Sequence, residues 1–307
     1  MPLYLGIDGG GTKTTCAVGD DMSVLAVASG PGSNVIRLGE AQARAGLHAA
    51  ISKACCDAGV SPLRVQSVCV GAAGATSADI NATVKNWVRQ VLPNAEVTVV
   101  GDMVIAMEAT LHGHPGVIVI SGTGSICYGR NERAQTARAG GWGFQVSDEG
   151  SGQWIGRTAV SDSLRAMDSA RETILMARIL QQWQLSSPEE LVKHANSSPA
   201  PNFAELFPAV QQAADVRDPL AGEVLARAGA ELSQLALIVL HRLWQPNETV
   251  RIGIAGGVLA HSSQVRRAFY NSMRAAWPRV AVCFQISEPV VGALWMARQS
   301  ALAVKAR

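Results

Sequence analysis

Three consecutive glycines interrupt an apolar segment close to the start of the chain. Residues 3–7 are mainly apolar, Asp8 and Gly9-Gly10-Gly11 follow, and Thr12, Lys13 and Thr14 precede a second run of β-branched and apolar residues. This order predicts a strand, a tight turn and a returning strand, because β-branched residues favour the pleat and glycine adopts turn geometry. A turn with so little side chain lets an oxyanion reach the backbone N–H groups, and an ordinary glycine-rich hairpin is the alternative.

Two other phosphate-binding motifs do not fit this segment. A P-loop needs a lysine directly after its second glycine and then a helix, whereas Thr12 follows Gly11 and a strand-like sequence comes next. A dinucleotide-binding fingerprint also requires a turn from strand to helix. The segment therefore predicts a phosphate-binding hairpin of a different kind, with Asp8 at the strand end placed to face a hydrated divalent cation.

Composition limits the classes of function. The chain has 307 residues, of which 48% are apolar and 16% charged, so we expect a large core and one or two domains. The net charge is +2 without a basic block, which makes nucleic acid an improbable partner. The apolar stretch 235–240 is too short to span a bilayer, and no leader precedes the first strand, so we expect no membrane partner and a cytoplasmic protein. The six cysteines form no CxxC pair and are expected to be mostly buried thiols.

Hydrophobic periodicity divides the rest of the chain into two halves with similar openings. Strands are expected at 23–29, 65–70, 97–100, 117–120, 250–254 and 280–286, and helices at 40–58, 77–92, 103–111, 262–276 and 289–303. A second glycine-and-hydroxyl turn occupies 121–125, and residues 152–241 are mostly helical. This order predicts mixed sheets flanked by helices.

A third glycine-rich turn, Gly256-Gly257, follows a predicted strand. With three such turns the chain resembles the superfamily of sugar kinases, heat-shock ATPases and actin. Within it, the chain resembles the BadF/BadG/BcrA/BcrD-type ATPase family, including N-acetylglucosamine kinase and glucosamine kinase. The resemblance runs from Gly6 to about Ala303, and its most specific parts are residues 6–14, 121–125, 140–143 and 148–151.

The resemblance implies an α/β fold of two ribonuclease-H-like, actin-like ATPase domains. Each domain would hold a mixed five-stranded sheet flanked by helices, with a cleft between the domains. The N-terminal lobe would comprise residues 1–112 plus 289–307, and the C-terminal lobe residues 113–288.

The resemblance also implies ATP and Mg²⁺ as cofactors. Asp8 would lie near Mg²⁺, through water, and the glycines of the third turn would lie against the adenosine. The residues expected to bind the nucleotide are Asp8, Gly10, Gly11, Thr12, Lys13, Thr14, Gly122, Thr123, Gly124, Gly256 and Gly257.

Asp102 is the candidate general base, because phosphoryl transfer needs positioning, charge neutralisation and an acceptor for the hydroxyl proton. Its local sequence also suits a helix N-cap, and both roles are compatible. The sugar is expected to contact Asn34, Gly140, Gly141, Trp142 and Asp148. Taken singly, Asn34 could be a turn residue, Asp148 a helix cap and Trp142 a core residue.

These features predict an ATP-dependent kinase that phosphorylates the 6-hydroxyl of a small-molecule amino sugar, N-acetylglucosamine or glucosamine, and that forms a homodimer. The alternative is an ATPase that activates a redox enzyme of the acyl-CoA reductase or dehydratase type. That class holds an iron–sulfur cluster between two subunits, and this chain lacks a suitable cysteine loop. The sequence also departs from the kinase pattern at residues 71–75, where a hydroxyl is usual, which leaves Thr76 or backbone as the contact there.

Overall fold

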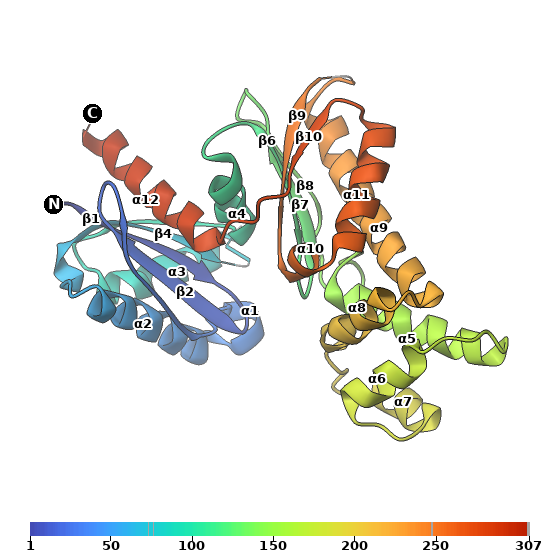
Figure 1. Cartoon of the computed structure of the whole chain (residues 1–307). Helices are drawn as coiled ribbons and strands as arrows, with labels where there is room; N and C mark the ends of the chain where they lie inside the picture. The colour runs from blue at the N-terminus through green and yellow to red at the C-terminus, as the bar shows by residue number, and fades with distance from the viewer. Residues whose placement is uncertain (73, 76, 247, 306–307) are drawn as a thin grey trace. The chain divides into compact units, whose positions relative to one another are not determined.

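The chain folds into two compact units in the computed structural model, which describes residues 1–72, 74–75, 77–246 and 248–305 (Figure 1). Unit 1 comprises Met1–His114 and Ser287–Arg307, and unit 2 comprises Pro115–Ile286. The first unit is therefore built from both ends of the chain. Thr76, which the sequence offered as a substrate contact, and Ala73 lie outside the described residues.

The sheet of unit 1 has five strands in the order β3-β2-β1-β4-β5. Strands β1 and β2 form the predicted hairpin, with Ile7 opposite Cys16 and Gly9 opposite Thr14. Strand β4 then pairs parallel to β1, and β5 pairs parallel to β4. The strands are β1 (Leu3–Gly9), β2 (Lys13–Gly19), β3 (Val24–Pro31), β4 (Val65–Ala72) and β5 (Glu96–Val100).

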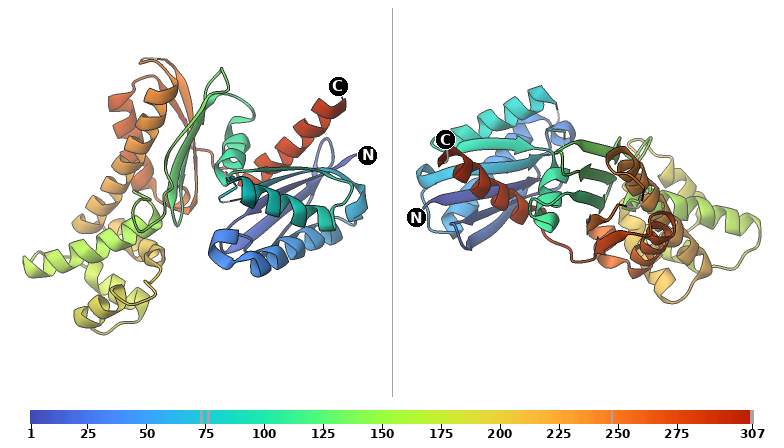
Figure 2. Two further views of the ribbon diagram at one scale, coloured as in Figure 1. Left: turned by 180° about the vertical axis from the view of Figure 1, so that it is seen from behind. Right: turned by 90° about the horizontal axis from the view of Figure 1, so that it is seen from above.

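Helices cover both faces of this sheet. Alternate residues of β1 point to opposite faces: Leu5 and Ile7 join the core beneath α2 and α3, whereas Tyr4 joins the core beneath α4 and α12. Figure 2 shows these two helix pairs on opposite sides of the sheet. The helices of unit 1 are α1 (Val35–Leu38), α2 (Glu40–Asp57), the 3₁₀ turn η1 (Pro62–Arg64), α3 (Ala78–Val91), α4 (Asp102–Leu111) and α12 (Pro289–Lys305).

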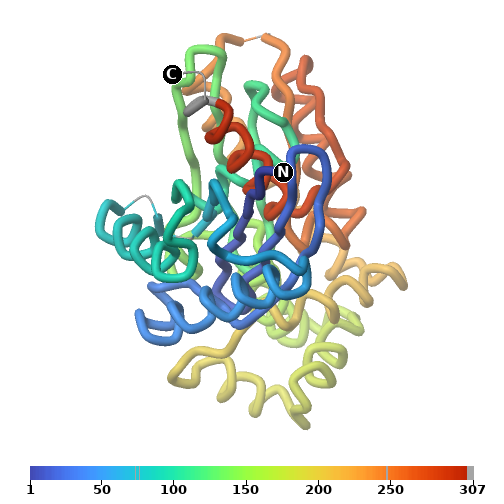
Figure 3. Tube along the Cα trace, turned by 90° about the vertical axis from the view of Figure 1, so that its left-hand side faces the viewer, coloured from blue at the N-terminus to red at the C-terminus, as the bar shows by residue number. Residues whose placement is uncertain are grey.

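The last helix packs directly on the first strand, through glycines. A methyl group on Gly6 of β1 would lie 2.7 Å from the carbonyl oxygen of Val290, and a methyl group on Gly292 of α12 would lie 3.0 Å from the Cα atom of Ala109 in α4. Figure 3 traces the return of the C-terminal segment to the N-terminal strand. The absence of side chains at these two positions lets β1, α4 and α12 approach to backbone contact.

Unit 2 repeats the mixed arrangement, with strand order β10-β9-β6-β7-β8. Its hairpin pairs Ser121 with Ser125, and β9 runs parallel to both β6 and β10. The strands are β6 (Gly116–Ser121), β7 (Ser125–Arg130), β8 (Thr136–Gly140), β9 (Val250–Ala255) and β10 (Val280–Cys283).

Two helices, α9 and α11, pack against each other, and α9 also packs on strands β6, β7 and β8. Helices α5 to α8 form a group at one end of the unit, as Figure 1 shows. The helices of unit 2 are α5 (Gly152–Asp168), α6 (Leu175–Trp183), α7 (Pro188–Ala195), η2 (Phe203–Leu206), α8 (Phe207–Asp215), α9 (Pro219–Leu243), α10 (Gly257–His261) and α11 (Ser263–Ala276).

The predicted fold class, two mixed five-stranded sheets flanked by helices, is confirmed. Some local features differ from expectation. Strand β8 and the four-residue helix α1 were not predicted, because β8 (TARAG) contains only one β-branched residue and no large apolar one, and α1 is too short for periodicity to reveal. The last strand ends at Cys283 rather than at residue 286, because its pairing with β9 stops where Cys283 lies opposite Gly253.

Burial inside the fold describes two groups that the composition leaves open: the most apolar long helix and the cysteines. Within the part of the chain that is described, α9 is the one helix long and apolar enough to cross a membrane, but 61% of its apolar window is buried inside the protein. It is the central helix of unit 2. Of the cysteines, Cys16, Cys55, Cys69 and Cys127 are buried thiols, and Cys56 and Cys283 are exposed.

The close approach of α12 to β1 predicts a position that tolerates no side chain. Gly6→Ala should lower the free energy of unfolding by about 1–3 kcal/mol or more, because the new methyl group meets backbone atoms that cannot move aside. Gly222→Ala is the matched control: it lies in a helix with open space around it, and should stabilise by about 0.5–1 kcal/mol. Urea denaturation of the two variants measures both changes, and equal stability for Gly6→Ala and the parent would contradict the packing described.

Candidate active site

The first turn is narrow and exposes its side chains to solvent. The N–H group of Gly10 donates to the carbonyl oxygen of Lys13 at 3.1 Å, which closes the hairpin. Thr12 and Lys13 are exposed, whereas Gly10 and Gly11 are only partly so. The turn therefore presents a hydroxyl, an ammonium group and glycine backbone to any anion that approaches it.

A loop from the end of β3 is attached to this turn. The buried Thr14 hydroxyl donates to the Oγ atom of Ser33 at 2.8 Å, and the Ser33 N–H group donates to the carbonyl oxygen of Gly10 at 3.0 Å. A methyl group on Gly32 would lie 2.5 Å from the Gly11 carbonyl oxygen. Of the two threonines predicted to bind phosphate, Thr14 thus ties the turn to the neighbouring loop and Thr12 faces solvent.

Asn34 occupies the N-cap of α1. Its side-chain oxygen accepts a hydrogen bond from the Arg37 N–H group at 3.2 Å, which is the turn role that the sequence allowed. Capping uses the amide oxygen and not the NH₂ group. The residue is only partly buried, so its amide remains accessible as a donor for a sugar hydroxyl.

Negative charge accumulates near Asp8 at the end of β1. The pKa of Asp8 is raised from 3.8 to about 6, mainly by burial and also by the negative charges of Asp102 and Glu288, while Lys13 lowers it. Asp102 begins α4 directly after β5, and Glu288 directly precedes α12. The carboxylates therefore come from three segments that are far apart in the sequence.

Asp102 is held in place by the first turn of α4. Its Oδ1 atom accepts a hydrogen bond from the Met103 N–H group at 3.0 Å. The N-cap position belongs to Gly101, so Asp102 is the first residue of the helix rather than its cap. Burial raises the pKa of Asp102, although backbone N–H groups work against that rise.

The second turn is supported by the start of α5. The Gly122 N–H group donates to the Gly124 carbonyl oxygen at 2.9 Å. The carbonyl oxygens of Gly122 and Thr123 accept from the N–H groups of Gly152 and Gln153, at 2.8 Å and 3.2 Å. These bonds fix the turn carbonyls toward the helix and leave the Thr123 side chain exposed.

The third turn lies against the second. A methyl group on Gly256 would lie 2.9 Å from the Gly122 nitrogen, and the φ angle of Gly256 is +92°. Glycine is thus required there by the protein backbone itself. A methyl group on Gly257 would meet nothing within 4 Å, so only a ligand could exclude a side chain at that position.

Asp148 organises the turn and the loop before α5. Its buried carboxylate accepts hydrogen bonds from the backbone N–H groups of Ser125 and Gly143, and burial still raises its pKa. A methyl group on Gly124 would lie 2.7 Å from its Oδ2 atom. The cap of α5 is Ser151, so Asp148 is not the helix cap that its position in the sequence suggested.

Trp142 lies in the loop that Asp148 supports. It is 69% exposed, so it is not a core residue, and the Arg138 guanidinium lies 4.0 Å from the centre of its ring. Gly140 and Gly141 before it have φ angles of +72° and +70°, which glycine adopts without strain. The loop thereby holds a large aromatic surface in solvent.

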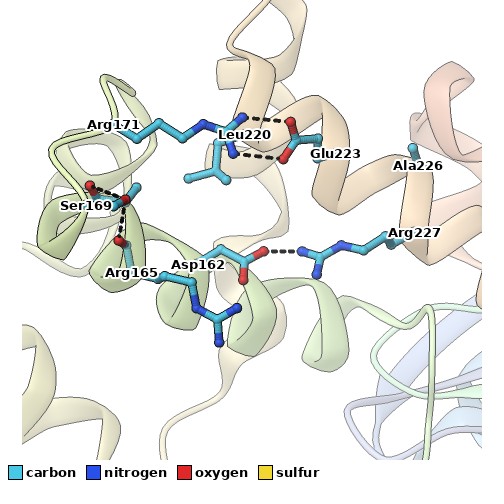
Figure 4. Close-up of a pocket in the computed structure, with 9 residues that line it drawn as sticks. Asp162, Arg165, Ser169, Arg171, Leu220, Glu223, Ala226 and Arg227 are labelled. Atoms are coloured by element: carbon cyan, nitrogen blue, oxygen red, sulfur yellow. Dashed lines mark hydrogen bonds and ion pairs between the residues drawn. The ribbon is translucent and has the colours of Figure 1, made fainter.

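A cavity of about 460 Å³ elsewhere in unit 2 contains none of these residues (Figure 4). It lies between α5 and α9, and two ion pairs line it: Arg171 with Glu223, and Arg227 with Asp162. Its charged groups are largely paired with one another. The volume of a cavity is therefore not the basis on which the candidate site is chosen.

The family model of the BadF/BadG/BcrA/BcrD ATPase family matches residues 5–297. This chain belongs to that family. The match spans both hairpins, Asp102, the Trp142 loop and most of α12.

Relatives within or near this family are described as amino-sugar kinases. The chain is 32% identical to an N-acetylmuramic acid/N-acetylglucosamine kinase of Clostridium acetobutylicum, over 97% of this chain and 99% of that protein. It is 28% identical to an N-acetyl-D-glucosamine kinase of Dictyostelium discoideum, over 97% and 98% of the two chains. A solved structure from Chromobacterium violaceum, described as a candidate N-acetylglucosamine kinase, matches with a TM-score of 0.75 and 25% identity, over 97% of this chain and 99% of that one.

Sequence reasoning missed three residues that lie near the candidate site. Glu288 precedes a helix-initiating proline and carries no local sign that it lies near Asp8. Ser33 and Arg37 belong to a loop and a short helix whose packing on the first turn depends on tertiary structure. Only the two polar side chains of the loop, the Ser33 hydroxyl followed by the Asn34 amide, offered a signal.

The raised pKa of Asp8 predicts a stability effect with a defined dependence on pH. The native carboxyl holds its proton more tightly than the carboxyl of the unfolded chain. Ionisation of Asp8 therefore lowers the stability of the folded protein. This penalty is absent below about pH 4 and has its full size above about pH 6. Asp8→Asn removes the charge and should stabilise the protein at about pH 7.5, by up to about 3 kcal/mol.

Thermal unfolding of parent and variant between about pH 5 and 8 measures this effect. The advantage of the variant should shrink as the pH falls and Asp8 becomes protonated in the parent. A variant that is less stable than the parent at neutral pH, or a difference that does not vary with pH, would contradict the electrostatic account.

Proposed function

We propose that this chain, an ATP-dependent sugar kinase of the BadF/BadG/BcrA/BcrD ATPase family, phosphorylates the 6-hydroxyl of an amino sugar, N-acetylglucosamine or glucosamine. The observation that carries the proposal is the environment of Asp102. Its carboxylate is largely buried at the start of α4, held by the Met103 N–H group, and has a raised pKa. A raised pKa makes a carboxylate a better proton acceptor for the attacking hydroxyl.

Two hairpins would hold the phosphates of ATP. In unit 1, the backbone of Gly10 and Gly11 with the exposed Thr12 and Lys13 provides donors and positive charge. Thr14 would act indirectly, by fixing the turn through Ser33. In unit 2, the corresponding groups are Gly122, Thr123 and Gly124, with Gly256 and Gly257 against the adenosine.

The residues around Asp8 fit a magnesium ion. Asp8 and Asp102 raise the local negative charge, and a divalent cation would compensate it. No cluster of three or more acidic, histidine or cysteine side chains suited to a metal occurs among the described residues. Mg²⁺ commonly keeps several waters and binds phosphate oxygens beside one or two carboxylates, so we place Asp8 near it through water. The bound ion would neutralise charge on the phosphates.

The sugar would contact Asn34 and the loop around Trp142. The Asn34 amide can donate to a hydroxyl while its oxygen caps α1. Trp142 offers an aromatic surface of the kind that packs on sugar rings, and Gly140 and Gly141 set its position. Asp148 would support this loop through its hydrogen bonds with the backbone of Ser125 and Gly143. The acceptor sites of its carboxylate that these bonds leave free would bind the sugar.

The activator ATPase is the weaker reading. An interfacial iron–sulfur cluster needs several thiolates from each subunit. The two exposed cysteines are Cys56 in α2 and Cys283 at the end of β10, and they belong to different units. From the family resemblance, we also propose that the protein is cytoplasmic and forms a homodimer. Sedimentation equilibrium tests the dimer.

The proposal predicts sugar-dependent ADP formation that needs Asp102. With MgATP, N-acetylglucosamine or glucosamine should support turnover, the 6-deoxy analogue should not, and Asp102→Asn should lower kcat by at least about 100-fold because the proton acceptor is lost. Asp79→Asn is the matched control, an exposed carboxylate in the first turn of α3 in the same unit.

Coupled ADP assays with N-acetylmuramic acid, glucose and buffer as further arms make this measurement. Turnover that is indifferent to every sugar would overturn the kinase. An Asp102→Asn variant as active as the parent would overturn the base assignment alone.

A further inference from the structure

The guanidinium of Arg37 lies on the first phosphate-binding turn. A methyl group on Gly11 would lie 3.0 Å from the Arg37 Cδ atom and 3.3 Å from its Nη1 atom. The side chain of Arg37 is exposed, and it forms neither an ion pair nor a hydrogen bond with any described residue. A guanidinium without a protein partner thus stands beside backbone groups suited to an oxyanion.

The backbone of Arg37 is fixed relative to that turn. Its N–H group is bound by the Asn34 cap, and the adjacent Ser33 is bonded to both Thr14 and Gly10. Only two residues separate the capping Asn34 from Arg37, so little freedom remains in the backbone that connects them. This hydrogen-bonded network fixes the backbone from which the Arg37 side chain extends over Gly11.

Two roles are compatible with this geometry. An exposed arginine can lay its aliphatic stem over a glycine turn while water solvates the charge. Alternatively, its planar group can bind a phosphate through two parallel hydrogen bonds, which are stronger than bonds between neutral groups. The second role is favoured because the Nη1 atom of the guanidinium, and not only the aliphatic stem, lies close to Gly11, in a turn whose backbone groups are suited to an oxyanion.

We propose that Arg37 binds the terminal phosphates of the nucleotide at the first turn and stabilises the charge on the transferred phosphoryl group. The inference rests on the proposed function in taking this hairpin as the nucleotide phosphate site. The short helix α1 carries Asn34 at its cap and Arg37 in its last turn. One element would therefore hold both the sugar and the phosphate.

Arg37→Met and Arg37→Lys test the inference through the number of phosphates on the ligand. Calorimetric titration of AMP, ADP and the non-hydrolysable ATP analogue AMPPNP measures affinity without turnover. Arg37→Met should weaken ADP or AMPPNP binding by about 10-fold or more and AMP binding by less than about 2-fold, because only the longer ligands reach the guanidinium. Arg37→Lys should be intermediate, since it keeps the charge without the planar group.

Arg64→Met is the matched control. Arg64 is an exposed arginine of the same unit, in the short turn before β4. Because β4 runs parallel to β1 with Val65 opposite Leu3, Arg64 lies at the opposite end of the strands from the turn after Gly9. Its loss should leave all three affinities and the sugar-kinase activity unchanged.

The outcomes separate this inference from the proposed function. Equal weakening of AMP and AMPPNP in Arg37→Met, or affinities equal to those of the parent, would overturn the phosphate role and leave Arg37 as a cover for Gly11. A parent that binds AMPPNP but phosphorylates no sugar would overturn the kinase proposal while the titrations still decide on Arg37. A parent that binds no nucleotide would overturn both.

Discussion

Negative charge at the carboxyl end of β1, which Lys13 offsets only in part, is the constraint on which the site depends. Asp8 is partly buried beside Asp102 and within reach of the charge of Glu288, and its pKa rises to about 6 as a result. Such an arrangement costs stability, and groups of this kind concentrate at functional sites. The tight packing of β1, α4 and α12 through Gly6 and Gly292 holds the segments that carry these charges.

The two hairpins share a sequence pattern but have different supports. The first is fastened to the loop at Ser33, through Thr14 and the backbone of Gly10. The second is fastened to the start of α5 and to the glycine turn at Gly256. The similarity of their sequences therefore reflects the requirement for close backbone approach, whereas the fixation of each turn is specific to its unit.

Much of the fold was predictable because strands, helices and turns follow from local pattern. The hairpin around Gly10 and the long helices had clear signals, while β8 lacks large apolar residues and α1 is too short to have one. The sequence could propose site residues where a motif suggests the chemistry, as at Asp102, whose role as a base stays a prediction. Their local roles were less predictable: Gly101 caps α4 and Ser151 caps α5, although Asp102 and Asp148 were equally plausible caps by residue type.

By itself, the sequence determined the alternation of apolar strands and glycine turns, the family of the chain and the candidate base Asp102. Only the tertiary structure decided that Glu288 lies near Asp8, that Asp148 binds the backbone at Ser125 and Gly143, and that Arg37 lies on Gly11. The reason is physical. Turn geometry and strand pairing depend on neighbouring residues, whereas electrostatic coupling depends on distances that the chain sets only once its distant segments have packed together.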